Sequence, residues 1–156
     1  MQDLTQSSLD KIQNKRLPGI DLGADSVHPC YDGLSILNIP ASVSQWLDAG
    51  PLTHAPLDVP ALDELADGVE QIVLLLVDAV GLQRCKQWLA SSAVRFKDAM
   101  QGSLMTALTS VVPSTTSAAL TTLWTGRSPA EHGILGYELF LREFGMVTNM
   151  ITHAPA

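Results

Sequence analysis

The clearest pattern in the chain is an unbroken run of six aliphatic residues at positions 72–77, which is followed directly by Asp78. A short apolar run of this kind is typical of a strand that is buried on both faces. Residues 82–90 come next and carry apolar side chains at helical spacing, which favours a helix with one apolar face. The pattern therefore predicts a buried strand over residues 71–77 and a helix after it.

A second strand and helix are expected further along the chain. Residues 103–109 alternate partly between apolar and polar positions and are rich in Thr and Leu, which favours a strand. Pro113 ends this stretch, residues 115–124 fit a helix, and Gly126 stands where a left-handed C-cap is expected. Residues 147–151 fit a third strand.

Strands that alternate with helices predict an α/β fold with a mostly parallel sheet flanked by helices. Residues 1–59 differ, because prolines and glycines interrupt them and only short helices are expected, near residues 9–16 and 41–47. We interpret residues 1–59 as a lead-in and cover segment. Residues 60–156, which open with a short helix near 61–69, are interpreted as the N-terminal part of the α/β domain.

Composition narrows the class of protein. A chain of 156 residues with 46% hydrophobic residues and a mean hydropathy of +0.19 builds one globular core rather than a disordered segment. The net charge of −7 argues against a nucleic-acid surface, which needs clustered Lys and Arg. Cys30 and Cys85 form neither a disulfide framework nor a spaced metal motif. No signal sequence or membrane span is evident, so a cytoplasmic protein is expected.

Two polar positions stand where chemistry is expected. Ligands of parallel sheets bind at the carboxyl ends of the strands, and both Asp78 and the turn at residues 113–116 follow predicted strands there. A carboxylate is a hard oxygen ligand for a divalent cation, and a hydroxyl at a helix N-terminus lies where an anion is favoured. Helix capping remains an alternative role for Asp78 and for the hydroxyls of Thr115, Thr116 and Ser117.

Three stretches, in this order, resemble the alkaline phosphatase superfamily, and within it the type I phosphodiesterase/nucleotide pyrophosphatase group. Asp78, the strand-ending aspartate within residues 76–81, is similar to the aspartate of the metal-binding Asp-Gly motif of that family. The spacing from Pro113 to the Thr-Gly pair that ends in Gly126 resembles the nucleophile segment and places its threonine on Thr116. Residues 125–134 are similar to the signature Thr-Gly-x-x-Pro-x-x-His-Gly-Ile.

The resemblance implies an alkaline-phosphatase-like fold and a site with two divalent metal ions, commonly zinc. Asp78 and Thr116 would be metal ligands, and Thr116 would attack phosphorus and form a phosphothreonine intermediate. The substrate would be a small phosphorylated compound such as a nucleotide. Tyr137 stands where nucleotide pyrophosphatases of the family carry a phosphate-binding asparagine, so it is the expected substrate contact, with packing of its ring as the alternative.

The resemblance also implies ligands that this sequence lacks. Members of the family carry two further aspartates and three histidines downstream, but none of the four histidines here stands in an Asp-His pair, and those ions would be bound weakly or not at all. The domain therefore looks truncated, and its missing C-terminal part is an expected partner. Three hypotheses follow: a phosphoesterase complete only in a longer protein, an inactive fragment or non-catalytic binding module, and an unrelated α/β protein.

Overall fold

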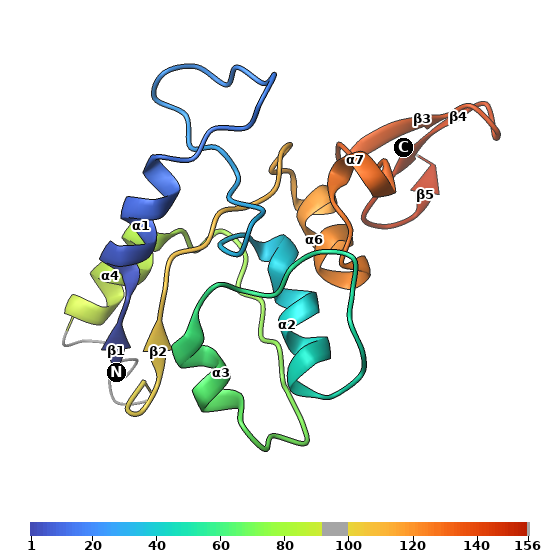
Figure 1. Cartoon of the computed structure of the whole chain (residues 1–156). Coiled ribbons are helices and arrows are strands. Elements are labelled where there is room, and N and C mark those ends of the chain that lie inside the picture. The colour runs from blue at the N-terminus through green and yellow to red at the C-terminus, as the bar shows by residue number, and fades with distance from the viewer. Residues whose placement is uncertain (92–99, 156) are drawn as a thin grey trace.

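Short helices and strands joined by long irregular connections form the computed structural model, which describes residues 1–91 and 100–155 (Figure 1). In chain order the elements are β1 (Gln2–Asp3), α1 (Thr5–Gln13), the 3₁₀ helix η1 (Ile36–Asn38), α2 (Ile39–Trp46), α3 (Pro60–Ala66), α4 (Leu82–Ala90), β2 (Leu104–Met105), α6 (Thr116–Thr125), α7 (Pro129–His132), β3 (Glu138–Leu141), β4 (Met146–Asn149) and β5 (Ala154–Pro155).

The helices lie close to where local signals in the sequence place them. Helix α4 has the predicted bounds, and α2 carries Pro40 in its first turn, where the missing N–H of proline costs nothing. Helix α6 ends at Gly126, whose φ of 65° forms the expected left-handed cap. Helix α1 begins earlier than expected, because Asp3 accepts a hydrogen bond from the N–H of Thr5 at its start.

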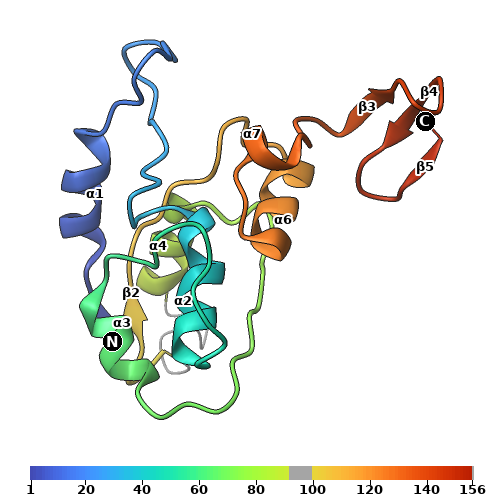
Figure 2. The ribbon, with the colours of Figure 1, turned by 45° about the vertical axis from the view of Figure 1, so that its right-hand side comes forward.

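The prediction of a mostly parallel sheet is wrong for the three-stranded sheet, the larger of the two sheets in the described residues. Strands β1 and β2 do pair in parallel, but over two residues only, and a parallel bridge between Ser35 and Thr109 continues the pairing. Strands β3, β4 and β5 form an antiparallel sheet, because the turn before β4, with Gly145 at φ 62°, folds the chain back on itself. The structure is thus a mixture of helices and short strands that extends away from the main body at β3–β5 (Figures 1 and 2).

The prediction of a buried strand at residues 71–77 is also wrong. The segment is not a strand, and its side chains are largely exposed: Val73 is 93% and Leu75 82% accessible to solvent. None of its backbone groups has a hydrogen-bond partner in the described part of the chain. A β-strand is stable only when a neighbouring strand satisfies these groups, so the apolar composition alone did not bury it.

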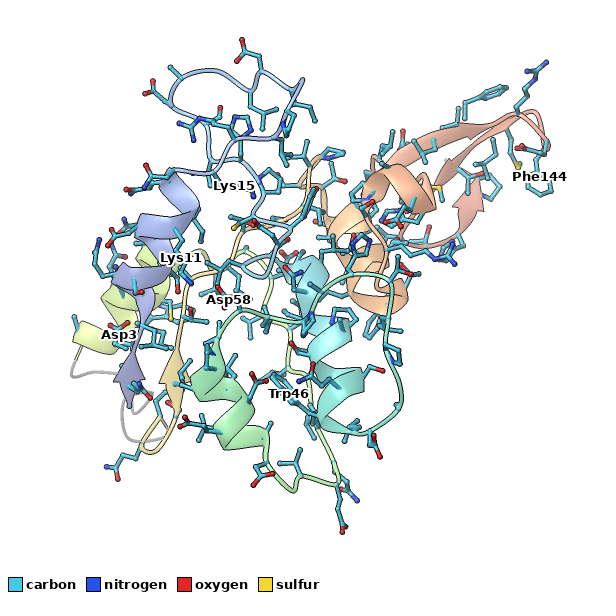
Figure 3. The ribbon with its side chains drawn as sticks, in the orientation of Figure 1. Asp3, Lys11, Lys15, Trp46, Asp58 and Phe144 are labelled. Carbon is cyan, nitrogen blue, oxygen red and sulfur yellow. The ribbon has the colours of Figure 1, made fainter. Side chains whose placement is uncertain are left out.

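The main core lies between segments from both halves of the sequence. Its buried residues are Ile12, Cys30, Leu34, Leu57, Val59 and Ala107. Five of these six come from residues 1–59, so the predicted lead-in and cover segment contributes most of the core. Lys11 of α1 adds an ion pair of 2.7 Å to Asp58 on the surface of this region (Figure 3). The boundary between residues 59 and 60 stays a prediction, but the two parts share one core.

A buried amide holds η1 in position. The Asn38 side chain is fully buried, and its nitrogen donates to the carbonyl oxygens of Tyr31 and Ala55 at 2.8 and 2.9 Å. Its oxygen accepts from the N–H of Ser35 at 2.9 Å. This one side chain therefore joins three segments around η1.

Within the described residues no helix is both long and apolar enough to cross a membrane.

We expect Asn38→Ala to lower the free energy of unfolding by about 2–4 kcal/mol, because it removes the partner of the buried Ser35 N–H and of two partly buried carbonyls, those of Tyr31 and Ala55. Urea denaturation followed by tryptophan fluorescence measures this change. The control is Ser44→Ala in α2, where an exposed hydroxyl donates to the Gly50 carbonyl oxygen at 2.6 Å, and a cost of about 0.5 kcal/mol is expected. Equal costs for the two variants would contradict the role given to Asn38.

Candidate functional site

Asp78 and Thr116 line the same pocket, which has a volume of about 230 Å³. The other lining residues are aliphatic: Ile36, Leu76, Ala119, Leu120 and Leu123. The two polar side chains come from different parts of the chain, one from the turn before α4 and the other from the first turn of α6. The structure thus places one carboxylate and one hydroxyl in a small space with otherwise hydrocarbon walls.

Asp78 lies in a turn and does not cap helix α4. Its Oδ1 accepts a hydrogen bond from the N–H of Ala79 at 2.8 Å, while the N-cap of α4 is Gly81 and no side chain caps that helix. Ala79 adopts a φ of 59°, a left-handed conformation in which a side chain is strained. The capping alternative for Asp78 is therefore not what the structure shows, and the carboxylate remains exposed at the pocket.

The three hydroxyls at the start of α6 have three different environments. Thr115 is the N-cap: its Oγ1 accepts from the N–H of Ala118 at 3.4 Å and donates to the carbonyl oxygen of Leu135 at 3.1 Å. Ser117 is buried and donates to the carbonyl oxygen of Gly136 at 2.7 Å. Thr116 is exposed, and its hydroxyl has no partner among the described residues. Only the hydroxyl of Thr116 is left available to a ligand.

Tyr137 lies next to a residue that is bonded to the start of α6, while its own carbonyl oxygen accepts from the N–H of Met150 at 2.7 Å. Ser117 bonds the carbonyl of Gly136, the residue before Tyr137, and so holds this turn against the start of α6. The Tyr137 side chain is 54% exposed and does not line the pocket of Asp78 and Thr116. The structure therefore brings together two of the three residues singled out in the sequence.

Three of the four histidines hydrogen-bond to other parts of the described chain. His28 is buried and accepts from the N–H of Leu17 through Nδ1 at 3.1 Å. His54 contacts Glu131 at 2.7 Å. His132 accepts from the N–H of Ile134 through Nδ1 at 3.0 Å, so its Nε2 carries the proton and lies 3.2 Å from the hydroxyl oxygen of Thr122. Two of these bonds are between neighbouring parts of the chain, whereas that of His54 joins the connection before α3 to helix α7.

The donors present do not fit a two-ion site. In residues 1–91 and 100–155 no three side chains of His, Cys, Asp and Glu converge in a way that would hold a metal ion. The pocket offers one carboxylate and one hydroxyl. Two divalent ions need at least about three protein ligands each, so Asp78 and Thr116 do not hold such a pair by themselves.

Two features of the site were missed by reasoning from the sequence. Ile36 lines the pocket from η1, far from the motifs, and nothing in the pattern around it indicates this role. The bonds from Thr115 and Ser117 to residues 135 and 136 were also missed. The unbroken run of hydroxyls at positions 115–117 was a signal for them, since neighbouring side chains at a helix start point in different directions.

Comparison with known proteins gives one match. The family model of type I phosphodiesterase / nucleotide pyrophosphatase matches residues 72–155, more than half of the chain, and spans both Asp78 and Thr116. No curated protein and no solved structure matches the chain.

The environment of His132 predicts a pH dependence of stability. Desolvation holds the pKa of His132 below its usual value of 6.5, so the folded state favours the neutral ring. The unfolded chain binds the proton more readily, and the stabilisation is therefore complete above pH 6.5 and declines as the pH falls below it. We expect the free energy of unfolding, measured by urea titration between about pH 8 and pH 5, to fall over this range.

The matched variants are His132→Gln and His153→Gln. Replacement of His132 is expected to flatten the pH profile between about pH 7 and pH 5, whereas replacement of the exposed His153 leaves its shape unchanged. Glu131 adds a separate loss of stability at lower pH. Hydrogen bonds from the Ser128 hydroxyl and N–H, and then from His54, lower its pKa from 4.5 to about 2, so this contribution declines as the pH falls below 4.5. A profile with the same slope in all three proteins would refute the assignment to His132.

Proposed function

We propose, from the premise that this chain belongs to the type I phosphodiesterase / nucleotide pyrophosphatase family, that it carries the nucleophile of a phosphoester hydrolase at Thr116. One observation carries the proposal. Thr116 is the hydroxyl at the start of α6 that caps nothing and tethers nothing, and it shares a pocket with Asp78.

The start of α6 also suits the binding of a phosphate group. The Thr115 side chain accepts from the N–H of Ala118. The backbone N–H groups of Thr116 and Ser117 have no acceptor among the described residues. Free N–H groups and the helix dipole favour an anion at this end of a ten-residue helix. A phosphate bound there would lie beside the hydroxyl that attacks it.

The reaction proposed is an in-line displacement. Thr116 Oγ1 forms a bond to phosphorus while the bond to the leaving oxygen breaks, and the hydroxyl proton passes to the departing oxygen. Water then attacks the phosphothreonine, which releases the phosphoryl group and restores the hydroxyl. The substrate is proposed to be a small phosphorylated compound such as a nucleotide, carrying a diester, pyrophosphate or monoester bond, with Tyr137 as a candidate contact.

Metal dependence is part of the proposal, but it requires ligands beyond this pair. Two divalent ions, zinc by resemblance to the family, would be held only when further carboxylate or imidazole groups join Asp78 and Thr116. A segment beyond these 156 residues, or another polypeptide, would supply those groups. The exposed segment at residues 72–77 supports this view, because it leads directly to Asp78 and its backbone has no partner in residues 1–91 and 100–155.

A second function is favoured by the same shortage of ligands. With a single carboxylate and no converging cluster of ligands in the described residues, the chain alone is suited to act as a non-catalytic fragment or binding module. The two functions differ in one measurable property, the affinity of the isolated chain for zinc.

We expect the 156-residue chain alone to bind Zn²⁺ weakly and to hydrolyse no p-nitrophenyl phosphate ester. A site with two protein ligands in place of six or more lacks most of its binding free energy. Isothermal titration calorimetry with ZnCl₂ measures the affinity, and Asp78→Asn is expected to abolish what binding there is at this pocket. Tight binding of two ions by the isolated chain would show that its own residues complete the site.

In a longer protein or complex that is active, Thr116→Ala should reduce turnover of a p-nitrophenyl ester by at least about 10⁴-fold, since the nucleophile is lost. The control is Thr125→Ala at the other end of α6, where the hydroxyl bonds the carbonyl oxygen of Thr121 at 2.6 Å and lies outside the pocket. Turnover near the level of the parent protein in Thr116→Ala would mean that another group attacks phosphorus.

A further inference from the structure

Residues 103–109 form an extended segment that contains β2 and is paired along one edge. The carbonyl oxygens of Ser103 and Met105 accept hydrogen bonds from β1 at 2.9 and 2.8 Å. Thr109 uses both its backbone groups to bond residues 34 and 36, at 2.8 and 3.0 Å. These three residues have odd numbers, and peptide groups in a strand alternate in direction, so they all bond along the same edge.

The opposite edge is open. The backbone groups of the even-numbered residues Leu104, Thr106 and Leu108 point the other way and have no hydrogen-bond partner among the described residues. All three residues are half-buried, so their peptide groups lie in a partly desolvated position. An unpaired strand edge of this kind accepts an additional strand.

A groove lies along this strand. Its volume is about 600 Å³, and its walls include Thr106 and Leu108 of the strand, Leu9 and Ile12 of α1, and Leu82 of α4. None of the residues that line it carries a charge. The groove therefore fits an uncharged apolar segment and offers nothing to hold an ionic ligand.

The chain itself carries an element with matching chemistry. Residues 72–77 are six aliphatic residues without charge, proline or glycine, and their backbone groups are unpaired in the described part of the chain. Figures 1 and 2 both show this segment running apart from β2. It is held elsewhere in its own molecule, since Leu76 and Asp78 line the pocket beside α6.

We propose that residues 72–77 of one copy dock as an added strand along the open edge at residues 104–108 of a second copy. Within residues 1–91 and 100–155 each copy offers this open edge and this unpaired segment, so the exchange is reciprocal and closes a twofold-symmetric dimer. The contact satisfies backbone groups on both sides and removes from water the two most exposed aliphatic residues, Val73 and Leu75.

The first test is sedimentation equilibrium of the whole chain over a range of concentrations. The parent chain is expected to be a dimer, and Val73→Lys and Leu75→Lys are each expected to raise the dissociation constant at least about tenfold, because a charge then enters an uncharged groove. The control is Phe144→Lys, which changes a residue 73% exposed on the separate β3–β4 hairpin (Figure 3). This variant is expected to dimerise like the parent.

The second test locates the contact by hydrogen exchange of individual backbone amides. Dimer formation is expected to slow exchange at Leu104, Thr106 and Leu108 and within residues 72–77, in proportion to the fraction of dimer. A chain that stays monomeric at all concentrations would overturn the proposal. So would a dimer in which residues 72–77 are protected and residues 104–108 are not, since the segment would then pair with itself. Protection of both segments in the monomer would assign the docking to a single molecule.

Discussion

The arrangement of this protein depends on the hydrogen bonds of one buried threonine. Thr109 bonds the backbone of residues 34 and 36, and its hydroxyl also accepts from the N–H of Cys30 at 2.9 Å and donates to the Leu34 carbonyl oxygen at 3.0 Å. These bonds join the first part of the chain to the part that matches the family. They hold residues 103–109, which precede helix α6, against η1, whose Ile36 borders the candidate site. The core around Leu34 and Ala107 forms on the same line of contact.

The first turn of α6 shows how a helix start separates structural from chemical roles. Three consecutive hydroxyl residues enter it, and two are used to fix the backbone. Thr115 satisfies an N–H group that the helix leaves without an intrahelical partner, and Ser117 fastens the turn at residues 135 and 136. Because both neighbours are fixed, Thr116 is held at the pocket with a free hydroxyl. A nucleophile needs this combination of a fixed backbone and an unpaired side chain.

One property connects the exposed apolar segment, the open strand edge and the shortage of metal ligands. Each is a group that lacks its partner within the described chain: aliphatic side chains without cover, peptide groups without acceptors, and one carboxylate without other ligands. Burying residues 72–77 requires a neighbouring strand that pairs with their backbone. Such a strand would also bring its own side chains close to Asp78, which follows directly in the sequence. All three features are thus shortages of tertiary contacts within the described residues.

The sequence by itself determined the family and most of the helices, but not α7 or the start of α1. Caps and apolar spacing act within a few residues, so α4, the capped end at Gly126 and the motifs around Thr116 follow from local chemistry. Only the tertiary structure decided that residues 72–77 find no partner among the described residues, that residues 146–149 turn back antiparallel, and that Ile36 borders the pocket. A helix satisfies its own backbone, whereas a strand must find donors and acceptors in a segment distant along the chain, which no local pattern specifies.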